Sequence, residues 1–293
     1  MKLKLALLVA LLLIFRTNGN AQNYQSQQSQ LLVYNVGLNA LIGGIGGVIN
    51  KKEGEKWHQA FFKNCAFGGL GGLVKYHSKY LNYQTSKEKN FGLNYLNRAY
   101  YYLGHSITNN ASLNRGICSN YSFQLYLFNV DVNFTDKIKI KPKISLTTFF
   151  FTNFYLINGY KINLNKSLKY GVIYYDRGHT LEKQIAFGSA NTIAAIDGFE
   201  KKYPEPSIVI PHEMTHTYQF ADYYALNYFF EPLHSRMRKN KTMKVLDRFI
   251  CWDLPFFFLS YHTQNMLKPD PVHYNNFYEF EAQAMATRRY VPR

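Results

Sequence analysis

Two apolar stretches of the chain carry the same glycine pattern, and this pattern limits how the first part of the protein can fold. Residues 43–47 read GGIGG and residues 68–72 read GGLGG, 25 residues further on, with a polar segment at residues 50–56 between them. Glycines four residues apart lie on one side of a helix and let a second helix approach closely. The pattern therefore predicts a Gly-rich apolar helical hairpin over residues 31–85.

This hairpin could be buried in a soluble protein or embedded in a membrane. Residues 31–49 contain no charged side chain, which suits either environment. The second apolar run is short and lies between Lys63 and Lys75, whereas a helix that crosses a bilayer needs about 20 apolar residues. The length argument favours a buried soluble hairpin, and membrane association through residues 31–75 is the alternative.

The N-terminus has the order of features that is typical of a secretory signal peptide. Lys2 and Lys4 precede an unbroken apolar run at residues 5–15, and a segment of small residues ends at Ala21. We therefore expect residues 1–21 to be removed and the protein to be exported to the periplasm, the outer envelope or the medium. An uncleaved anchor is the alternative. The Gln- and Ser-rich residues 22–30 are then predicted to be a linker.

The chain is strongly basic, with a formal net charge of +16, or +13 once Lys2, Lys4 and Arg16 are lost with the signal peptide. A basic surface can bind anionic lipid headgroups. The basic residues are dispersed, however, and cluster only at residues 236–241, which favours a role in solubility. We find no DNA- or RNA-binding module and expect no nucleic-acid partner.

The three cysteines, Cys65, Cys118 and Cys251, do not have the spacing of a cysteine-based zinc site. One disulfide is possible in an oxidising compartment, and one thiol would then remain free. The sequence does not determine which pair would form.

The middle of the chain, residues 86–200, is predicted to be β-rich. Apolar residues alternate with polar ones in several runs between residues 121 and 175, and residues 137–141 alternate lysine with isoleucine. Further β-like runs occupy residues 144–157, 160–164 and 170–175, and Asn158-Gly159 is typical of a hairpin turn. These runs predict an antiparallel meander of about four to six strands. Residues 179–195 could form a helix.

Residues 212–216 read HEMTH, which predicts a metal site on a helix. His212 and His216 would lie one turn apart on one helical face, so both rings could reach one tetrahedral ion. Glu213 lies beside them and could act as general base on a metal-bound water. We therefore predict one Zn²⁺ per chain in a mostly helical domain at residues 201–293, with helices over residues 208–230, 278–289 and part of 243–260. Two ordinary surface histidines are the alternative.

A third ligand must come from elsewhere, and Glu279 and Glu281 are the candidates. On a helix these two carboxylates point about 200° apart, so only one should face the ion. The pairing of HExxH with a later Glu-bearing helix resembles the gluzincin group of zinc metallopeptidases. The stretch EFEAQAMA (residues 279–286) is similar to the Glu-x-x-Ala-Asp motif of the CAAX prenyl protease family.

This resemblance covers two short motifs in the last third of the chain. It implies that Glu279 is the third zinc ligand, with Glu281 as the fallback. It also implies that Ala282 is a small packing residue and that Gln283 stands where the family has the Asp that supports the first histidine. Amide for carboxylate keeps a hydrogen bond and loses a charge. The transmembrane helices of that family are not evident in this sequence.

Other residues could close or assist the site. Asp222 follows His216 by six residues, as a metzincin ligand would, but that arrangement needs glycine where Gln219 stands. His234, His262 and His273 are further options for the third ligand, although lone histidines are more often ordinary polar residues. His262 or His273 could instead bind a transition-state oxygen. Tyr218, Tyr223 and Tyr224 could do the same, although such residues more often pack.

The sequence as a whole predicts an α+β fold, in which a Gly-rich helical hairpin and an antiparallel meander precede a helical zinc-binding domain. The function expected is an exported zinc-dependent metallopeptidase-like hydrolase acting on a peptide or protein, with Glu213 activating the attacking water. The alternative is a catalytically inactive metalloprotein, or an envelope-associated interaction protein, that retains this fold. A third possibility is a membrane-inserted envelope protein in which the HExxH motif is fortuitous.

Overall fold

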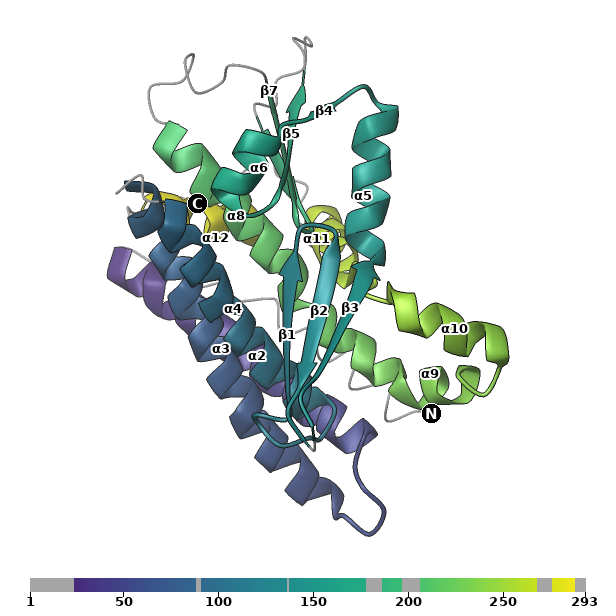
Figure 1. Ribbon diagram of the computed structural model, residues 1–293. Coiled ribbons are helices and arrows are strands. Elements are labelled where there is room, and N and C mark those ends of the chain that lie inside the picture. The colour runs from purple at the N-terminus through teal and green to yellow at the C-terminus, as the bar shows by residue number, and fades with distance from the viewer. Residues whose placement is uncertain are drawn as a thin grey trace.

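The computed structural model describes residues 24–87, 91–135, 137–177, 186–196, 206–267 and 276–287. Within these residues the fold is α+β, as predicted: long N-terminal helices, two small sheets and a helical C-terminal region (Figure 1). The predicted signal peptide at residues 1–21 and His273 lie outside the described residues.

Three long helices form an N-terminal bundle, seen at the lower left of Figure 1. They are α2 (Tyr24–Ile49), α3 (Trp57–Lys87) and α4 (Phe91–Ser112). The first two form the predicted hairpin and pack closely along their length. A β-carbon on Gly68 would overlap the backbone carbonyl of Asn39, so the two backbones touch where the glycines lie. The glycine repeat therefore sets the contact between α2 and α3.

Two predictions for this region are wrong. Residues 24–30 belong to α2 and not to a linker, because Gln27 is buried and the Tyr76 hydroxyl donates to Gln28 Oε1 at 3.0 Å. The segment predicted to be β-rich, residues 86–200, begins with helix α4, whose Tyr101 and Ala111 are fully buried. Polar side chains on the buried face of α4, such as Asn110, weaken the apolar periodicity that would have indicated a helix.

Among the described helices, residues Gln25–Ile49 form the one segment long and apolar enough to cross a membrane. Half of its 18-residue apolar window is buried inside the protein.

The first sheet lies beside α4. It contains the antiparallel strands β1 (Asn120–Leu125), β2 (Phe128–Asn133) and β3 (Lys139–Ser145), and β3 also pairs in parallel with the short β8 (Ile250–Cys251). An antiparallel meander is thus present, but within the described residues it has three strands instead of the predicted four to six and ends at Ser145.

Residues 146–157, predicted to be β, form helix α5 (Leu146–Ile157). Ser145 caps this helix, since its hydroxyl accepts a hydrogen bond from the Thr148 backbone N–H at 3.1 Å. Phe151 and Tyr155, one turn apart, pack into the core. The cap and this packing override the β-propensity of the Thr- and Phe-rich sequence.

The second sheet has the strand order β4-β5-β7-β6. It contains β4 (Lys161–Ile162), β5 (Ile173–Arg177), β6 (Ala186–Ser189) and β7 (Thr192–Ile196), and helix α6 (Leu164–Tyr170) joins β4 to β5. The strands β5 and β7 are parallel, and the outer pairs are antiparallel. The helix predicted at residues 179–195 is wrong over β6 and β7, which form a hairpin turning at Ala190 (φ 48°). Asn158-Gly159 ends α5 and does not join two strands.

The C-terminal region is helical, as predicted, and contains α8 (Pro206–Asp222), the 3₁₀ segment η1 (Tyr224–Phe230), α9 (Glu231–Met237), α10 (Lys241–Phe249), α11 (Phe256–Leu267) and α12 (Phe277–Thr287). The α-helix predicted over residues 208–230 ends at Asp222, and Pro211 lies inside it. One core cluster joins Leu38 of α2, Tyr155 of α5, Phe220 of α8 and Tyr278 of α12. The N-terminal, middle and C-terminal segments that the sequence analysis separated therefore share one hydrophobic core.

Candidate metal centre

Helices α8 and α12 pack against each other and bring three candidate ligands together. Nε2 of His212 and Nε2 of His216 are 3.1 Å apart. Oε2 of Glu279 lies 3.3 Å from each of these nitrogens. Glu279 and His216 are buried and His212 is slightly more exposed, and this is the one group of three such side chains found among the described residues.

The spacing of these three atoms fits a metal ion. In a tetrahedral zinc site with bonds of about 2.0–2.1 Å, two ligand atoms lie about 3.3 Å apart. The three separations agree with this value within 0.2 Å. One carboxylate and two imidazoles are also one of the donor sets found in catalytic zinc sites, which leave a fourth position for water or substrate.

Two glutamines orient the two histidine rings. Nδ1 of His216 lies 2.8 Å from Gln219 Oε1, and Nδ1 of His212 lies 3.2 Å from Gln283 Oε1. An amide oxygen can only accept, so each Nδ1 carries a hydrogen, and in the neutral ring that binds a metal each Nε2 directs a lone pair at the other ligands. Three electron-rich atoms at this separation repel one another unless a cation lies between them.

The electrostatics of His216 show the same requirement for a positive charge. Burial lowers the pKa of His216. The nearby Glu279 carboxylate, together with the charge of Glu213, raises it by more than burial lowers it, so the pKa is about 9. Without a metal, a proton on His216 therefore compensates the negative charge of the cluster. Proton and metal ion compete for the same place.

Glu213 follows His212 on α8 and is buried. Among the described residues its carboxylate has no hydrogen bond. Its backbone carbonyl lies against Gly188 of β6, where a β-carbon would overlap it. Burial raises the pKa of Tyr155 on α5, and the charge of Glu213 adds to this.

Two tyrosines that the sequence analysis did not identify border the site. The Tyr261 hydroxyl on α11 donates to Glu279 Oε1 at 3.3 Å. The Tyr155 hydroxyl on α5 lies 2.7 Å from Ser189 Oγ, next to Gly188. Neither tyrosine stands in a recognisable motif, and both reach the site through tertiary packing, so no local signal could have found them.

Glu281, the fallback ligand, points away from the histidines and is fully buried against the bundle. Its Oε1 accepts hydrogen bonds from Lys79 Nζ at 3.0 Å and Asn35 Nδ2 at 2.7 Å. Its Oε2 accepts from Gln219 Nε2 at 2.9 Å.

Asp222, the metzincin-type candidate, also faces the bundle. It forms ion pairs with Lys79 at 2.5 Å and Lys75 at 3.5 Å, and accepts from the Tyr101 hydroxyl at 2.8 Å. The structure therefore does not bring it to His212 and His216.

The other candidates of the sequence lie elsewhere. Tyr218 stacks on Tyr101, and Tyr224 is buried in the same cluster. Tyr223 is hydrogen-bonded to Tyr34 at 2.8 Å. His262 is exposed and stacks on Phe258, and His234 lines a separate cavity.

All three cysteines are free thiols in this structure. Cys251 is partly buried, and this burial raises the pKa of its thiol well above the usual range.

No protein-family model, curated protein or solved structure matches this chain. The similarity of its two motifs to those of gluzincins therefore remains an expectation from the sequence.

Proposed function

We propose that the protein is a zinc-dependent hydrolase of the metallopeptidase type. The observation that supports this most strongly is the convergence of His212, His216 and Glu279 at metal-ligand spacing, with the buried Glu213 beside them. Two neutral imidazoles and a carboxylate would hold the ion. When bound, zinc would supply the Lewis acidity that activates water and polarises a carbonyl group.

Glu213 is the proposed general base. Its carboxylate is buried and has no hydrogen-bond partner among the described residues, so its oxygens are available to a water at the site. Glu213 would accept the proton of that water as it attacks the substrate carbonyl and would then deliver the proton to the leaving amine. Tyr155 stays protonated because its pKa is raised, so its hydroxyl can donate a hydrogen bond nearby.

Strand β6 gives a peptide substrate a place to bind. Within the described part of the chain β6 is the end strand of its sheet and pairs with β7 alone. Because Gly188 has no side chain, this strand can lie directly against the backbone of Glu213. An extended peptide can add to such an edge through backbone hydrogen bonds, which would place its carbonyl groups beside the candidate metal centre.

A non-catalytic metalloprotein is the second candidate, and Gln283 is the observation that favours it. A carboxylate that accepts from a ligating histidine raises the basicity of that ligand, whereas the amide of Gln283 keeps the hydrogen bond without the charge. This protein would bind metal and lack turnover.

The test is zinc content by mass spectrometry together with hydrolysis of a quenched-fluorescence peptide library. We expect about one zinc per chain in the wild-type protein and in Glu213→Gln, but loss of turnover in Glu213→Gln. Glu279→Gln should lose both, whereas Glu53→Gln in the exposed α2–α3 loop is the matched control and should lose neither. Absence of zinc after reconstitution would overturn the proposal. Zinc without hydrolysis in the wild-type protein would favour the second candidate.

A further inference from the structure

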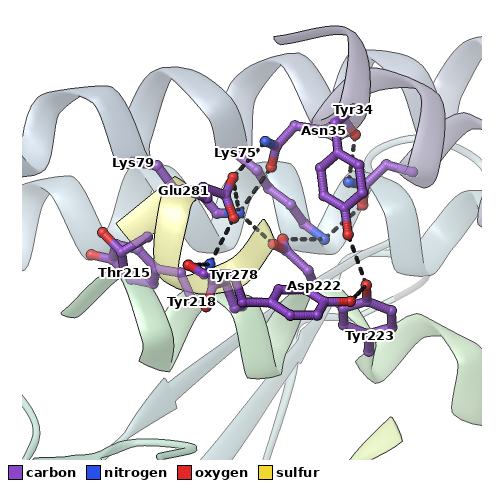
Figure 2. A network of polar contacts seen from close by, with 12 residues as sticks. Tyr34, Asn35, Lys75, Lys79, Thr215, Tyr218, Asp222, Tyr223, Tyr278 and Glu281 are labelled. Carbon is purple, nitrogen blue, oxygen red and sulfur yellow. Dashed lines mark hydrogen bonds and ion pairs between the residues drawn. The ribbon is translucent and has the colours of Figure 1, made fainter. Parts of the chain in front are cut away.

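A cluster of buried charges lies behind the candidate metal centre, between the N-terminal bundle and the α8–α12 pair. It contains Lys75 and Lys79 of α3, Asp222 of α8 and Glu281 of α12, and each side chain is at most 2% exposed. Figure 2 shows the two lysines reaching from one side toward the two carboxylates on the other. Two positive and two negative charges balance, which is necessary because an unpaired charge at this depth costs several kcal/mol.

Lys79 is the centre of this cluster. Its ammonium group donates to Asp222 Oδ2 at 2.5 Å, to Glu281 Oε1 at 3.0 Å and to Asn35 Oδ1 at 2.9 Å. An ammonium group has three hydrogens, so its capacity is filled. Lys79 thereby joins α2, α3, α8 and α12 at one point.

The glycine repeat determines where this lysine lies. A β-carbon on Gly72 would overlap the backbone carbonyl of Asn35, so α2 and α3 touch there. Lys79 follows Gly72 by two helical turns, on the same side of α3. The close contact therefore brings the lysine next to Asn35 and within reach of the carboxylates of α8 and α12.

Gln219 connects this cluster to the metal centre. Its Nε2 donates to the backbone carbonyl of Tyr278 at 2.9 Å and to Glu281 Oε2 at 2.9 Å. Neither acceptor can donate in return, since one is a carbonyl and the other a carboxylate paired with Lys79. The amide consequently has a single orientation, with Oε1 facing His216 Nδ1 at 2.8 Å.

This orientation selects one tautomer of His216. Because Gln219 Oε1 can only accept, Nδ1 must carry the hydrogen in the neutral ring, and the lone pair of Nε2 then faces His212 and Glu279. The tautomer needed for metal binding is thus set by contacts that begin on α3, outside both sequence motifs.

We infer that Gln219 and Glu281 are positioning residues for the metal centre, and that the chain of contacts Lys79–Glu281–Gln219–His216 makes zinc affinity depend on the helical bundle. The inference rests on the proposed zinc site, but not on peptidase activity. Partners that orient ligating histidines in this way typically contribute 10–100-fold to metal affinity.

The experiment measures the zinc dissociation constant by competition with a chromophoric chelator, and the absorption spectrum of the cobalt(II)-substituted protein. Gln219→Leu should weaken zinc binding about 10–100-fold and change the cobalt spectrum. The matched control is Gln124→Leu, because Gln124 is a buried glutamine hydrogen-bonded to Tyr102 and Asp253, away from the histidines. It should lower the thermal stability and leave zinc affinity and spectrum unchanged.

A double-mutant cycle tests the chain of contacts itself. Glu281→Gln removes the charge that fixes the Gln219 amide and should also weaken zinc binding. In the Gln219→Leu background the same change should have no further effect, since the chain is already broken. Additive losses would overturn the inference. If Gln219→Leu does not fold, Glu281→Gln alone carries the test, and unchanged affinity and spectrum in that variant overturn it.

The outcomes separate this inference from the proposed function. A wild-type protein that binds no zinc overturns both. Zinc binding that is unaffected by Gln219→Leu overturns the inference and leaves the hydrolase proposal standing. Zinc binding that depends on Gln219, in a protein without peptidase activity, supports the inference and overturns the hydrolase.

Discussion

Nζ of Lys79 lies 2.5 Å from Oδ2 of Asp222, and this ion pair joins α3 of the bundle to the end of the helix that carries His212 and His216. Both side chains are almost completely buried. The attraction within the pair adds little to the stability of the fold, because burial of both charges is costly. The pair matters because it keeps either charge from being buried without a partner.

Removing the ammonium group should be costly. We expect Lys79→Met to lower the free energy of unfolding by roughly 3–5 kcal/mol, because Asp222 and Glu281 would be left buried with less compensation. Urea unfolding followed by circular dichroism at neutral pH gives this value. The matched control is Lys63→Met, since Lys63 forms an exposed ion pair with Glu55 at 3.0 Å and should cost less than about 1 kcal/mol. Equal effects of the two substitutions would contradict the role of Lys79.

The close contact between α2 and α3 at the glycine repeat can be tested by alanine substitution of two adjacent glycines. Gly68→Ala would place a β-carbon on the Asn39 carbonyl and should destabilise the protein by roughly 1–3 kcal/mol. Gly69→Ala would meet only ordinary contacts at 3.6 Å, so the better helix propensity of alanine should leave stability unchanged or raise it by up to about 1 kcal/mol. Thermal unfolding of both variants decides the matter. Similar melting temperatures would show that the two helices do not touch at Gly68.

Zinc affinity should depend on pH through His216. Because its pKa is about 9 without a metal, zinc that binds at pH 7 would have to displace a proton, so affinity should rise about tenfold per pH unit toward pH 9. The same shift has a consequence for the metal-free protein, since the stability that protonated His216 contributes is present below pH 6.5 and is lost as the pH rises through 9. Calorimetry in buffers of different ionisation enthalpy should find about one proton released per zinc at pH 7. Binding without proton release would refute this account.

Asp253 should give the protein a second pH dependence, away from the metal centre. Burial raises its pKa from 3.8 to about 7, despite hydrogen bonds from Ser145 and the Thr147 backbone. The stability linked to the protonated form is present below pH 3.8 and is lost as the pH rises through 7, a change of up to about 4 kcal/mol.

Asp253→Asn keeps the shape of this side chain and removes its titration. The stability of the variant relative to wild type should therefore increase between pH 5 and pH 8, as measured by urea unfolding at each pH. Asp247→Asn, which removes a partly exposed carboxylate beside Lys143, is measured in parallel for comparison. A difference between Asp253→Asn and wild type that stays constant over this range would exclude a raised pKa.

The parts of the site that the sequence could predict are those that depend on helical periodicity. His212 and His216 share a face because they are four residues apart, and Glu279 and Glu281 face opposite ways because they are two apart. Whether Glu279 or Glu281 would meet the histidines depends on how α12 is rotated against α8, and the sequence supported one choice only through a resemblance.

The polar partners of the site could not be predicted. Gln219 carries no signal of its role, and the contact between Lys79 and Asp222 joins residues 143 positions apart. Helices α4 and α5 were missed for related reasons: α4 buries many polar side chains, and α5 has the composition of a strand but is held by its Ser145 cap and by tertiary packing. In each case long-range contacts decided what the local sequence left open.

The position of the two lysines also determines the order in which this molecule can assemble. Within the described parts of the chain, Asp222 and Glu281 find their counter-ions on α3, across sequence separations of 143 and 202 residues. A fragment that held only the C-terminal helices would contain both histidines but would lack the bundle that covers the face of α8 and α12 carrying these two carboxylates. We therefore expect the candidate metal centre to be among the last parts to form on the folding pathway, after the bundle has docked, and the C-terminal third to be unable to fold as an autonomous unit.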